Sequence, residues 1–406
     1  MAAKTVAHLS RDEISGKRIL VRVDFNVPLT PQGAISDDTR IVRALPTLNY
    51  LLEAGGRLVV TSHLGRPKGE PRPEFSLQPV ARHLAELLEY PVRFCPELVG
   101  EEVAEAVDAL AQGELLLLEN TRFHPGETSN DPELSQRLAQ LGDLYVNDAF
   151  GTAHRAHAST VGAAETIRKK GGQALAGFLM ERELKYLGFV VETPERPFVA
   201  ILGGAKISGK IDVIQSLLPK VDRLIIGGAM ANTFFRALGL ETGDSLVEED
   251  RVEMARELLE RAGETLLLPV DCVVGKEMDA GAETRVVPRD AVGEGDRIGD
   301  IGPDSESLFA EALGKARTVV WNGPMGVFEL PPYSHGTVSV ARSVANVTDL
   351  GGVTVVGGGD SVSAAEQAGV SQRLSHVSTG GGASLEFLSG AQLPGVAALD
   401  TREGSE

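Results

Sequence analysis

The sequence predicts an α/β protein with doubly wound parallel sheets. Short runs that are apolar at successive positions recur along the chain, and strands buried on both faces of a parallel sheet have this pattern. Segments with helical spacing separate the runs. This alternation of strand and helix favours right-handed crossovers and helices on both faces of each sheet.

The expected strands follow one another from the amino-terminal region almost to the end of the chain. In order they are RILVRVDF, GRLVVTSH, ELLLLENTRF, DLYVNDAF, PFVAILGG, DRLIIGGA, TLLLPVDCVV, RTVVWNGP and GVTVVGGGD.

Several of the expected helices have clear end signals. Asp131 followed by Pro132 is a good N-cap and first-turn pair, and Gly263 ends the pattern of residues 252–262. Pro46 lies inside the helical pattern of residues 41–52, where it predicts a helix start or a kink.

Length predicts two domains, because a single core stops growing at roughly 250 to 300 residues and this chain has 406. Residues 173–196 follow paired glycines, have helical spacing in their middle and end in TPERP. We therefore expect a connecting helix and hinge at 173–196, between a first domain at 1–172 and a second at 197–387.

Composition argues against several classes of partner. The chain has 39 basic and 57 acidic residues and a formal charge of −18, which disfavours nucleic acid and anionic membranes. Cys95 and Cys272 stand in no disulfide or zinc spacing. No apolar run approaches the ~18 residues of a membrane span, and no secretory h-region is present. The expectation is a cytoplasmic protein.

Polar and basic residues collect where strands of the first half end. Any single arginine at such a position is more simply explained as a solvated surface side chain. Repetition at strand ends, where ligands of open α/β sheets bind, instead predicts a site for a small polyanion. The residues are Asp24, Asn26, Arg40, Ser62, His63, Arg66, Asn120, Arg122, Asn147, Asp148 and the stretch GTAHRAHAS.

Strand ends of the second half are rich in glycine instead. Glycine lets backbone N–H groups approach a phosphate, although tight strand-to-helix turns also need it. The loop GGAKISGK has the Walker A spacing as far as Lys210, but Ile211 stands where a Ser or Thr should hold magnesium. With Lys206 and Lys210 nearby, Asp360 is the natural carboxylate for Mg²⁺.

These features predict an anion site in one half and a nucleotide site in the other, a combination suited to phosphoryl transfer. Two alternatives from other classes remain. A P-loop NTPase would need Ser or Thr at position 211. A two-domain anion-binding protein without chemistry would share the cation cluster and the hinge.

The motifs together resemble one family, phosphoglycerate kinase. The similarity is carried by RVDFNVPL, TSHLGRPKG, LENTRFHPGE, VNDAFGTAHRAHAS, ILGGAKISGKI, WNGPMGVFE and STGGGASLEFL, which spread over most of the chain. The resemblance implies two Rossmann-like domains that close on each other. It also implies reversible phosphoryl transfer between 1,3-bisphosphoglycerate and ADP, giving 3-phosphoglycerate and ATP.

The resemblance also implies roles for individual residues. The triose would be bound by Asp24, Asn26, Arg40, His63, Arg66, Arg122 and Arg155. The nucleotide would be bound by Lys206, Lys210, Asn322, Glu329, Gly358, Gly359, Asp360 and Ser361, with Asp360 on Mg²⁺. Arg40, Lys206, Lys210, Gly381 and Gly382 would act on the moving phosphoryl group, in a direct in-line transfer without a phosphoenzyme. The tail 388–406 would return to the first domain, and the protein would be a monomer.

Overall fold

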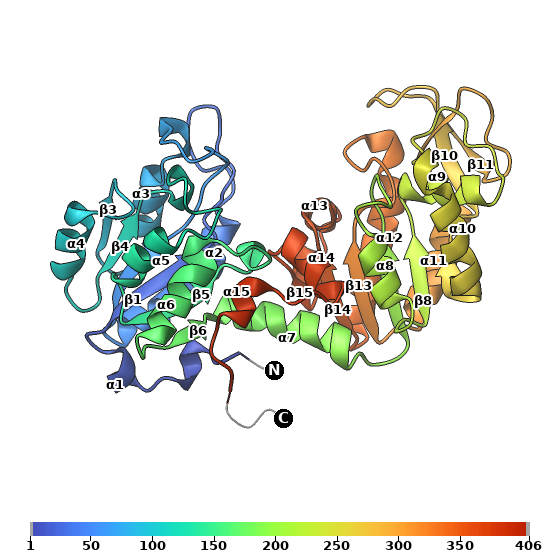
Figure 1. The fold of residues 1–406 in the computed structure, drawn as a ribbon. Helices are drawn as coiled ribbons and strands as arrows, with labels where there is room; N and C mark the ends of the chain where they lie inside the picture. The colour runs from blue at the N-terminus through green and yellow to red at the C-terminus, as the bar shows by residue number, and fades with distance from the viewer. Residues whose placement is uncertain (1–2, 403–406) are drawn as a thin grey trace. The chain divides into compact units, whose positions relative to one another are not determined.

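The computed structural model describes residues 3–402 and divides them into two compact units (Figure 1). One unit comprises the chain up to Lys185 and the segment from Gln392 onward, and the other comprises Tyr186–Ala391. The boundary between the units falls inside a helix, α7 (Phe178–Glu192), at the place where the sequence predicts a connecting helix.

The first unit is built on a six-stranded parallel sheet with the order β3-β4-β2-β1-β5-β6. Its strands are β1 (Arg18–Val23), β2 (Arg57–Thr61), β3 (Val92–Cys95), β4 (Leu115–Leu118), β5 (Leu144–Asp148) and β6 (Ala174–Ala176). The chain forms β1 in the middle of the sheet, then β2 beside it and β3 at the edge, and β4 fills the position between β2 and β3. The chain then crosses to the other side of β1, where it forms β5 and β6. The strand order therefore reverses between β1 and β5.

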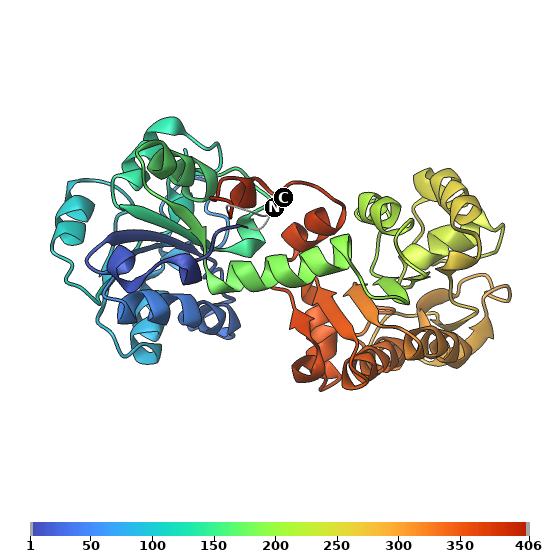
Figure 2. The ribbon, with the colours of Figure 1, turned by 90° about the horizontal axis from the view of Figure 1, so that it is seen from below.

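Helices cover both faces of this sheet, as Figure 2 shows most directly. Leucines of α2 and α3 pack against β1, β2 and β4 in one continuous core. On the other face, α5 presents Leu134 and Leu138, and α6 presents Ile167. The helices of this unit are α1 (Arg11–Ile14), α2 (Thr39–Glu53), α3 (Gln78–Leu87), α4 (Glu101–Asp108), α5 (Pro132–Ala139), α6 (Ala163–Lys169) and α15 (Pro394–Ala397).

The helix-end expectations can be compared directly with the structure. The Asp131 carboxylate accepts a hydrogen bond from Leu134 N at 2.8 Å, so Asp131 caps α5 as predicted. Gly263 follows the last residue of α10 with φ +50°, as expected of a terminating glycine. The helix α2 begins at Thr39 and continues through Pro46, so the alternative of a helix start at Pro46 is wrong.

The second unit contains another six-stranded parallel sheet, with the order β15-β14-β13-β7-β8-β9. Its strands are β7 (Phe198–Leu202), β8 (Arg223–Ile226), β9 (Leu266–Leu267), β13 (Thr318–Asn322), β14 (Val353–Gly357) and β15 (His376–Val377). Here the strand order reverses between β7 and β13. The predicted doubly wound, Rossmann-like architecture is confirmed in both units.

Helices also cover both faces of the second sheet. One core joins α11, α12 and α13 to the sheet around Trp321, a fully buried side chain of β13. The helices of this unit are α8 (Ile211–Leu217), α9 (Met230–Ala237), α10 (Val252–Ala262), α11 (Pro303–Gly314), α12 (His335–Asp349), α13 (Gly359–Gln367) and α14 (Gly382–Leu388).

One prediction about the strands needs correction. The run TLLLPVDCVV holds two strands that belong to different sheets, because Pro269 separates β9 from β10 (Asp271–Gly275). The latter pairs antiparallel with β11 (Thr284–Pro288) and β12 (Arg297–Ile301) in a three-stranded sheet. Residues of β11 are mostly exposed, so this strand lacks the continuous apolar run that marks the others.

The end of the chain packs on the first unit. The Asp400 carboxylate accepts a hydrogen bond from Ala174 N at 2.9 Å and forms an ion pair with Arg168 at 2.7 Å. Ala3 and Thr401 form an antiparallel bridge. Residues 403–406 of the predicted tail lie outside the described residues. Within residues 3–402, no helix is both long and apolar enough to span a bilayer.

Candidate functional site

The first candidate site lies at the carboxyl ends of β1, β2 and β4, next to the point where strand order reverses. A crevice outside the strand ends is the usual ligand position in such sheets. Arg22 comes from β1, Asp24 directly follows β1, His63 is the second residue after β2, and Arg122 lies in a 3₁₀ turn after β4. Parallel pairing of these strands brings the four side chains into one cluster.

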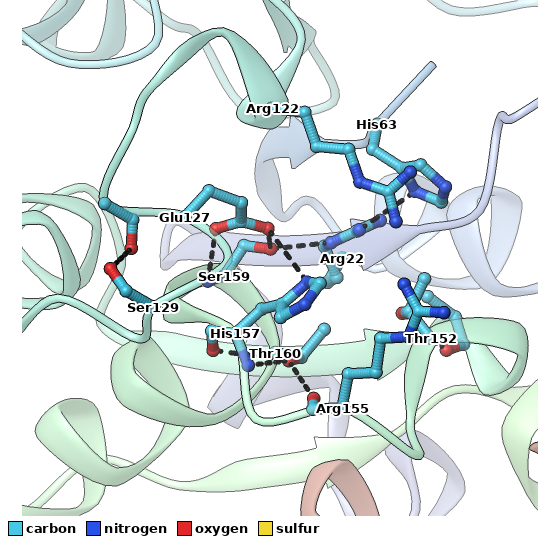
Figure 3. Close-up of polar contacts among 12 residues, drawn as sticks. Arg22, His63, Arg122, Glu127, Ser129, Thr152, Arg155, His157, Ser159 and Thr160 are labelled. Carbon is cyan, nitrogen blue, oxygen red and sulfur yellow. Dashed lines mark hydrogen bonds and ion pairs between the residues drawn. The ribbon is translucent and has the colours of Figure 1, made fainter. Parts of the chain in front are cut away.

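Arg22 is the centre of this cluster and is fully buried (Figure 3). Its Nε donates to Ser159 Oγ at 2.8 Å, and Nη2 lies 3.2 Å from His63 Nδ1. Nη1 donates to the carbonyl of Val23. The sequence places Arg22 in a motif and in a strand of the buried type, but it does not show which groups the guanidinium contacts.

His63 is only 4% exposed, and its pKa lies well below the usual value. Burial is the main cause, and the positive charges of Arg22, Arg122 and Arg40 add to it, while Asp24 opposes the change. His63 is therefore neutral at pH 7.

Asp24 lies between His63 and Arg40. Its Oδ2 forms an ion pair with Arg40 Nη1, and its Oδ1 lies 3.7 Å from His63 Nδ1. Burial alone would raise the pKa of Asp24, but its electrostatic interactions with the neighbouring His63, Arg40 and Arg22 outweigh burial and lower it. Asp24 Oδ1 is buried without a hydrogen-bond partner among residues 3–402. Such an oxygen can accept a hydrogen bond from a ligand.

Behind Arg22 lies a buried carboxylate, Glu127, which Figure 3 shows beside Ser159 and His157. Glu127 accepts hydrogen bonds from Ser159 Oγ at 2.5 Å and from Ser159 N at 3.0 Å. His157 Nδ1 lies 4.0 Å from Glu127, and burial lowers the pKa of His157 to about 4 against the opposing charge of Glu127. The sequence motifs contain Glu127 and Ser159 but do not reveal this contact, which depends on a π-helical turn at Ala158–Gly162.

The remaining predicted residues of this site differ in exposure. Arg122 donates to the carbonyl of Gly65 at 2.7 Å, and burial together with the charges of Arg22 and Arg155 lowers its pKa to about 10. Asn26 accepts a hydrogen bond from Gly65 N at 2.8 Å and so holds the same loop. Arg66 and Arg155 are exposed, so both are free to approach a ligand from solvent.

Other polar residues at strand ends hold the protein together instead of facing a ligand. Asn120 bonds to both the N–H and the carbonyl of Leu64. Asn147 donates to the carbonyl of Gly395, which anchors α15. Asp148 accepts from Met180 N in the first turn of α7, and burial raises its pKa to about 6.

The second candidate site lies where β7 and β13 end, at the reversal of the second sheet. Lys210 Nζ donates to the carbonyls of Gly203, at 2.7 Å, and Asn322, at 2.8 Å. Burial lowers the pKa of Lys210 to about 8, although the nearby carboxylate of Asp360 acts in the opposite direction. Lys206 is exposed on the same loop, and Ile211 is the first residue of α8.

The glycine loop after β14 is held close to Asn322. Asn322 Nδ2 donates to the carbonyl of Gly357 at 2.8 Å, and Ser361 Oγ accepts from Gly323 N at 2.5 Å. Gly358 has φ +93°, and a Cβ there would lie 2.9 Å from Asn322 Nδ2, so a larger residue would not fit. Gly359 and Asp360 then open α13 with their amides at its positive end.

A cleft of about 500 Å³ opens beside these loops. Leu246 and Val327 line it and are 52% and 37% exposed, so the cleft presents apolar side chains to a ligand. Glu329 and Asp360, both exposed, supply carboxylates at the cleft. A cleft that combines apolar side chains with polar groups suits a flat heteroaromatic ring. The sequence gives no signal for Leu246 and Val327, because single apolar residues in loops belong to no motif.

The two glycines that the resemblance assigns to the moving phosphoryl group lie at the start of α14. Gly381 has φ +49° and Gly382 begins α14. Gly380 N donates to Ser378 Oγ, which fixes the preceding turn.

The side chains at the cleft could hold a metal ion only if a bound ligand supplied further oxygen atoms. Among residues 3–402, no group of three or more His, Cys, Asp or Glu side chains is arranged to hold an ion. Asp360 is an exposed carboxylate at the cleft, and Mg²⁺ typically takes one or two carboxylates plus phosphate oxygens and water. Asp360 therefore fits a magnesium ion that a nucleotide carries in.

Comparisons with known proteins show the family to which the chain belongs. Residues 9–391 match the family model described as phosphoglycerate kinase. The chain is 52% identical over 403 residues to a phosphoglycerate kinase of Chlorobium limicola, covering 98% of this chain and 100% of that protein. It is 53% identical over 403 residues to a chloroplastic phosphoglycerate kinase of Chlamydomonas reinhardtii, covering 98% and 87%.

Solved structures show the same similarity. A structure of phosphoglycerate kinase from Coxiella burnetii matches with a TM-score of 0.86 and 41% identity, covering 98% of both chains. A crystal structure of the enzyme from Pyrococcus horikoshii matches with a TM-score of 0.83 and 33% identity, again covering 98% of both chains.

Proposed function

The chain belongs to the phosphoglycerate kinase family, and from this premise we propose which of its residues bind each substrate and how they act. The protein is an enzyme, a phosphotransferase that moves a phosphoryl group between a phosphoglycerate and an adenine nucleotide. The alternative of an anion-binding protein without chemistry is not favoured.

The first unit binds the triose in this proposal. The supporting observation is a buried acceptor without a partner beside a group of basic side chains. Asp24 Oδ1 has no hydrogen-bond partner among the described residues, Arg40 pairs with Oδ2 of the same carboxylate, and His63 lies 3.7 Å from Oδ1. A hydroxyl of the triose donates to Asp24, and its anionic groups are bound by the cations. The residues assigned to the triose are Asp24, Asn26, Arg40, His63, Arg66, Arg122 and Arg155.

The second unit binds the nucleotide. The base enters the cleft lined by Leu246 and Val327, and the phosphates meet Lys206, Lys210 and the amides at the start of α13. The nucleotide residues are Lys206, Lys210, Asn322, Glu329, Gly358, Gly359, Asp360 and Ser361. Asp360 would hold Mg²⁺, which supplies charge neutralisation on the nucleotide phosphates when bound.

Each unit supplies one half-site, so in this proposal transfer follows closure of the two units. Arg40, Lys206 and Lys210 neutralise the oxygens of the moving phosphoryl group, and the amides of Gly381 and Gly382 donate to it. No general base is needed in the direction of ATP formation, because the attacking oxygen of ADP is already anionic.

The test of this proposal is Arg40→Ala in an assay of ATP- and magnesium-dependent consumption of 3-phosphoglycerate, coupled to oxidation of NADH. We expect kcat to fall about 100-fold with nucleotide Kd unchanged, because charge stabilisation is lost only in the transition state. Arg82→Ala is the matched control, since Arg82 is an exposed arginine of the same unit. A large rise in nucleotide Kd with normal kcat would sink the assignment of Arg40.

We also propose that the protein acts as a monomer in the cytoplasm, with small molecules as its partners and neither nucleic acid nor membrane. Sedimentation velocity at assay concentration tests the oligomeric state, and a dimer would contradict it.

A further inference from the structure

We infer that Arg22 is a positioning residue that fixes the tautomer of His63, so that His63 presents Nε2–H as a hydrogen-bond donor to the triose. The inference rests on the proposed assignment of His63 to the triose site. Arg22 itself is fully buried and acts through His63.

The first argument is the chemistry of the Arg22–His63 contact. Arg22 Nη2 lies 3.2 Å from His63 Nδ1 (Figure 3). A guanidinium has only donors, so the ring nitrogen that it contacts must accept. His63 Nδ1 therefore carries no proton, provided that the guanidinium stays in place.

The second argument is the charge around His63. Arg22 from β1 contacts the ring, the positive charges of Arg122 from the turn after β4 and of Arg40 from α2 also act on it, and Asp24 is the opposing carboxylate. Together with burial these groups keep the imidazole neutral. A neutral imidazole has one proton, and with Nδ1 accepting, that proton is on Nε2.

The third argument is that Arg22 is itself held in place. Its Nε donates to Ser159 Oγ at 2.8 Å, and Nη1 donates to the carbonyl of Val23. Ser159 Oγ uses its own proton toward Glu127 at 2.5 Å, which leaves a lone pair for Arg22. A planar fork bound on three sides cannot rotate, whereas a lysine ammonium would make these contacts one at a time.

The consequence concerns the sign of the interaction with substrate. With Nε2 protonated, His63 donates to an anionic oxygen. In the other tautomer Nε2 presents a lone pair, which repels the same oxygen. A hydrogen bond to a charged group corresponds to roughly a tenfold change in affinity or more.

The direct test uses the wild-type enzyme. Long-range ¹H–¹⁵N NMR of the imidazoles, with the His63 signals identified by their absence in His63→Leu, reports which nitrogen carries the proton. We expect an unprotonated Nδ1 and a protonated Nε2 from pH 6 to 8. A protonated Nδ1, in either the neutral or the charged ring, overturns the inference. This measurement needs no variant of Arg22.

The second test measures the role of Arg22. In Arg22→Met we expect the neutral His63 to become a mixture of tautomers and KM for 3-phosphoglycerate to rise roughly tenfold, with KM for ATP unchanged. Arg22→Lys should recover only part of this loss. Arg18→Lys is the control, because Arg18 lies on the same strand but pairs with Asp143 at the other end. If Arg22→Met does not fold, Ser159→Ala takes its place, with a smaller, severalfold rise expected.

The outcomes separate this inference from the proposed function. If His63→Leu leaves KM for 3-phosphoglycerate at the wild-type value, the assignment of His63 to the triose site fails, and the inference fails with it. If His63→Leu raises KM but Arg22→Met changes neither tautomer nor KM, the site stands and the inference is overturned.

Discussion

Lys210 offers the sharpest quantitative prediction, because its part-buried ammonium group donates to two carbonyls and burial lowers its pKa. Its Nζ donates to Gly203 and Asn322, and burial lowers its pKa from 10.5 to about 8. The bound nucleotide phosphates should restore the charge of the lysine. Nucleotide binding near pH 8 should therefore take up protons.

The size of the effect follows from these pKa values. The difference between 10.5 and about 8 corresponds to about 3 kcal/mol against the charged form of Lys210. Because the folded pKa is the lower one, this destabilises the free protein below about pH 8 and disappears as pH rises toward 10.5. A site with pKa about 8 takes up about 0.5 proton per nucleotide at pH 8 but only about 0.03 at pH 6.5.

Isothermal titration calorimetry of MgATP binding, repeated at pH 8 in buffers with different ionisation enthalpies, measures this uptake. Lys210→Met should abolish it, whereas Lys206→Met, which removes the exposed lysine of the same loop, should retain it. Zero uptake by the wild type at pH 8, or equal uptake by Lys210→Met, would refute the reasoning.

Two further predictions concern the second unit. Burial raises the pKa of Asp300 to about 7, so the free energy of unfolding should fall as pH rises from about 4 to 7, by about 4 kcal/mol at most. Urea unfolding at pH 5 and pH 8 should show a smaller pH dependence for Asp300→Asn than for the wild type. An equal pH dependence would contradict this prediction. Gly228 has φ +67°, and a Cβ there would lie 2.4 Å from Gly204 N. Gly228→Ala should therefore lower stability by about 2 kcal/mol and weaken ATP binding in calorimetry; unchanged ATP affinity, or an equal loss of 3-phosphoglycerate affinity, would count against it.

Much of the fold is readable from local sequence. Strands buried on both faces are mostly apolar at successive positions, so β1, β5, β7 and β13 can be recognised as apolar runs. The antiparallel sheet around β10 was not readable. Its outer strand β11 is mostly exposed and has no such run, so nothing local shows that β10 pairs with it instead of joining the parallel sheet.

Local sequence likewise predicts only part of the candidate sites. Residue type determined that cations follow the strands of the first half and glycines those of the second, and motif similarity determined the family. Only tertiary structure decided that Arg22 is buried against His63, that Glu127 supports it through Ser159, and that Lys210 folds onto two carbonyls. Local sequence sets what each side chain can donate, accept or bury. Distances between strands far apart in the chain set which partner it finds, and therefore its pKa, its tautomer and its role.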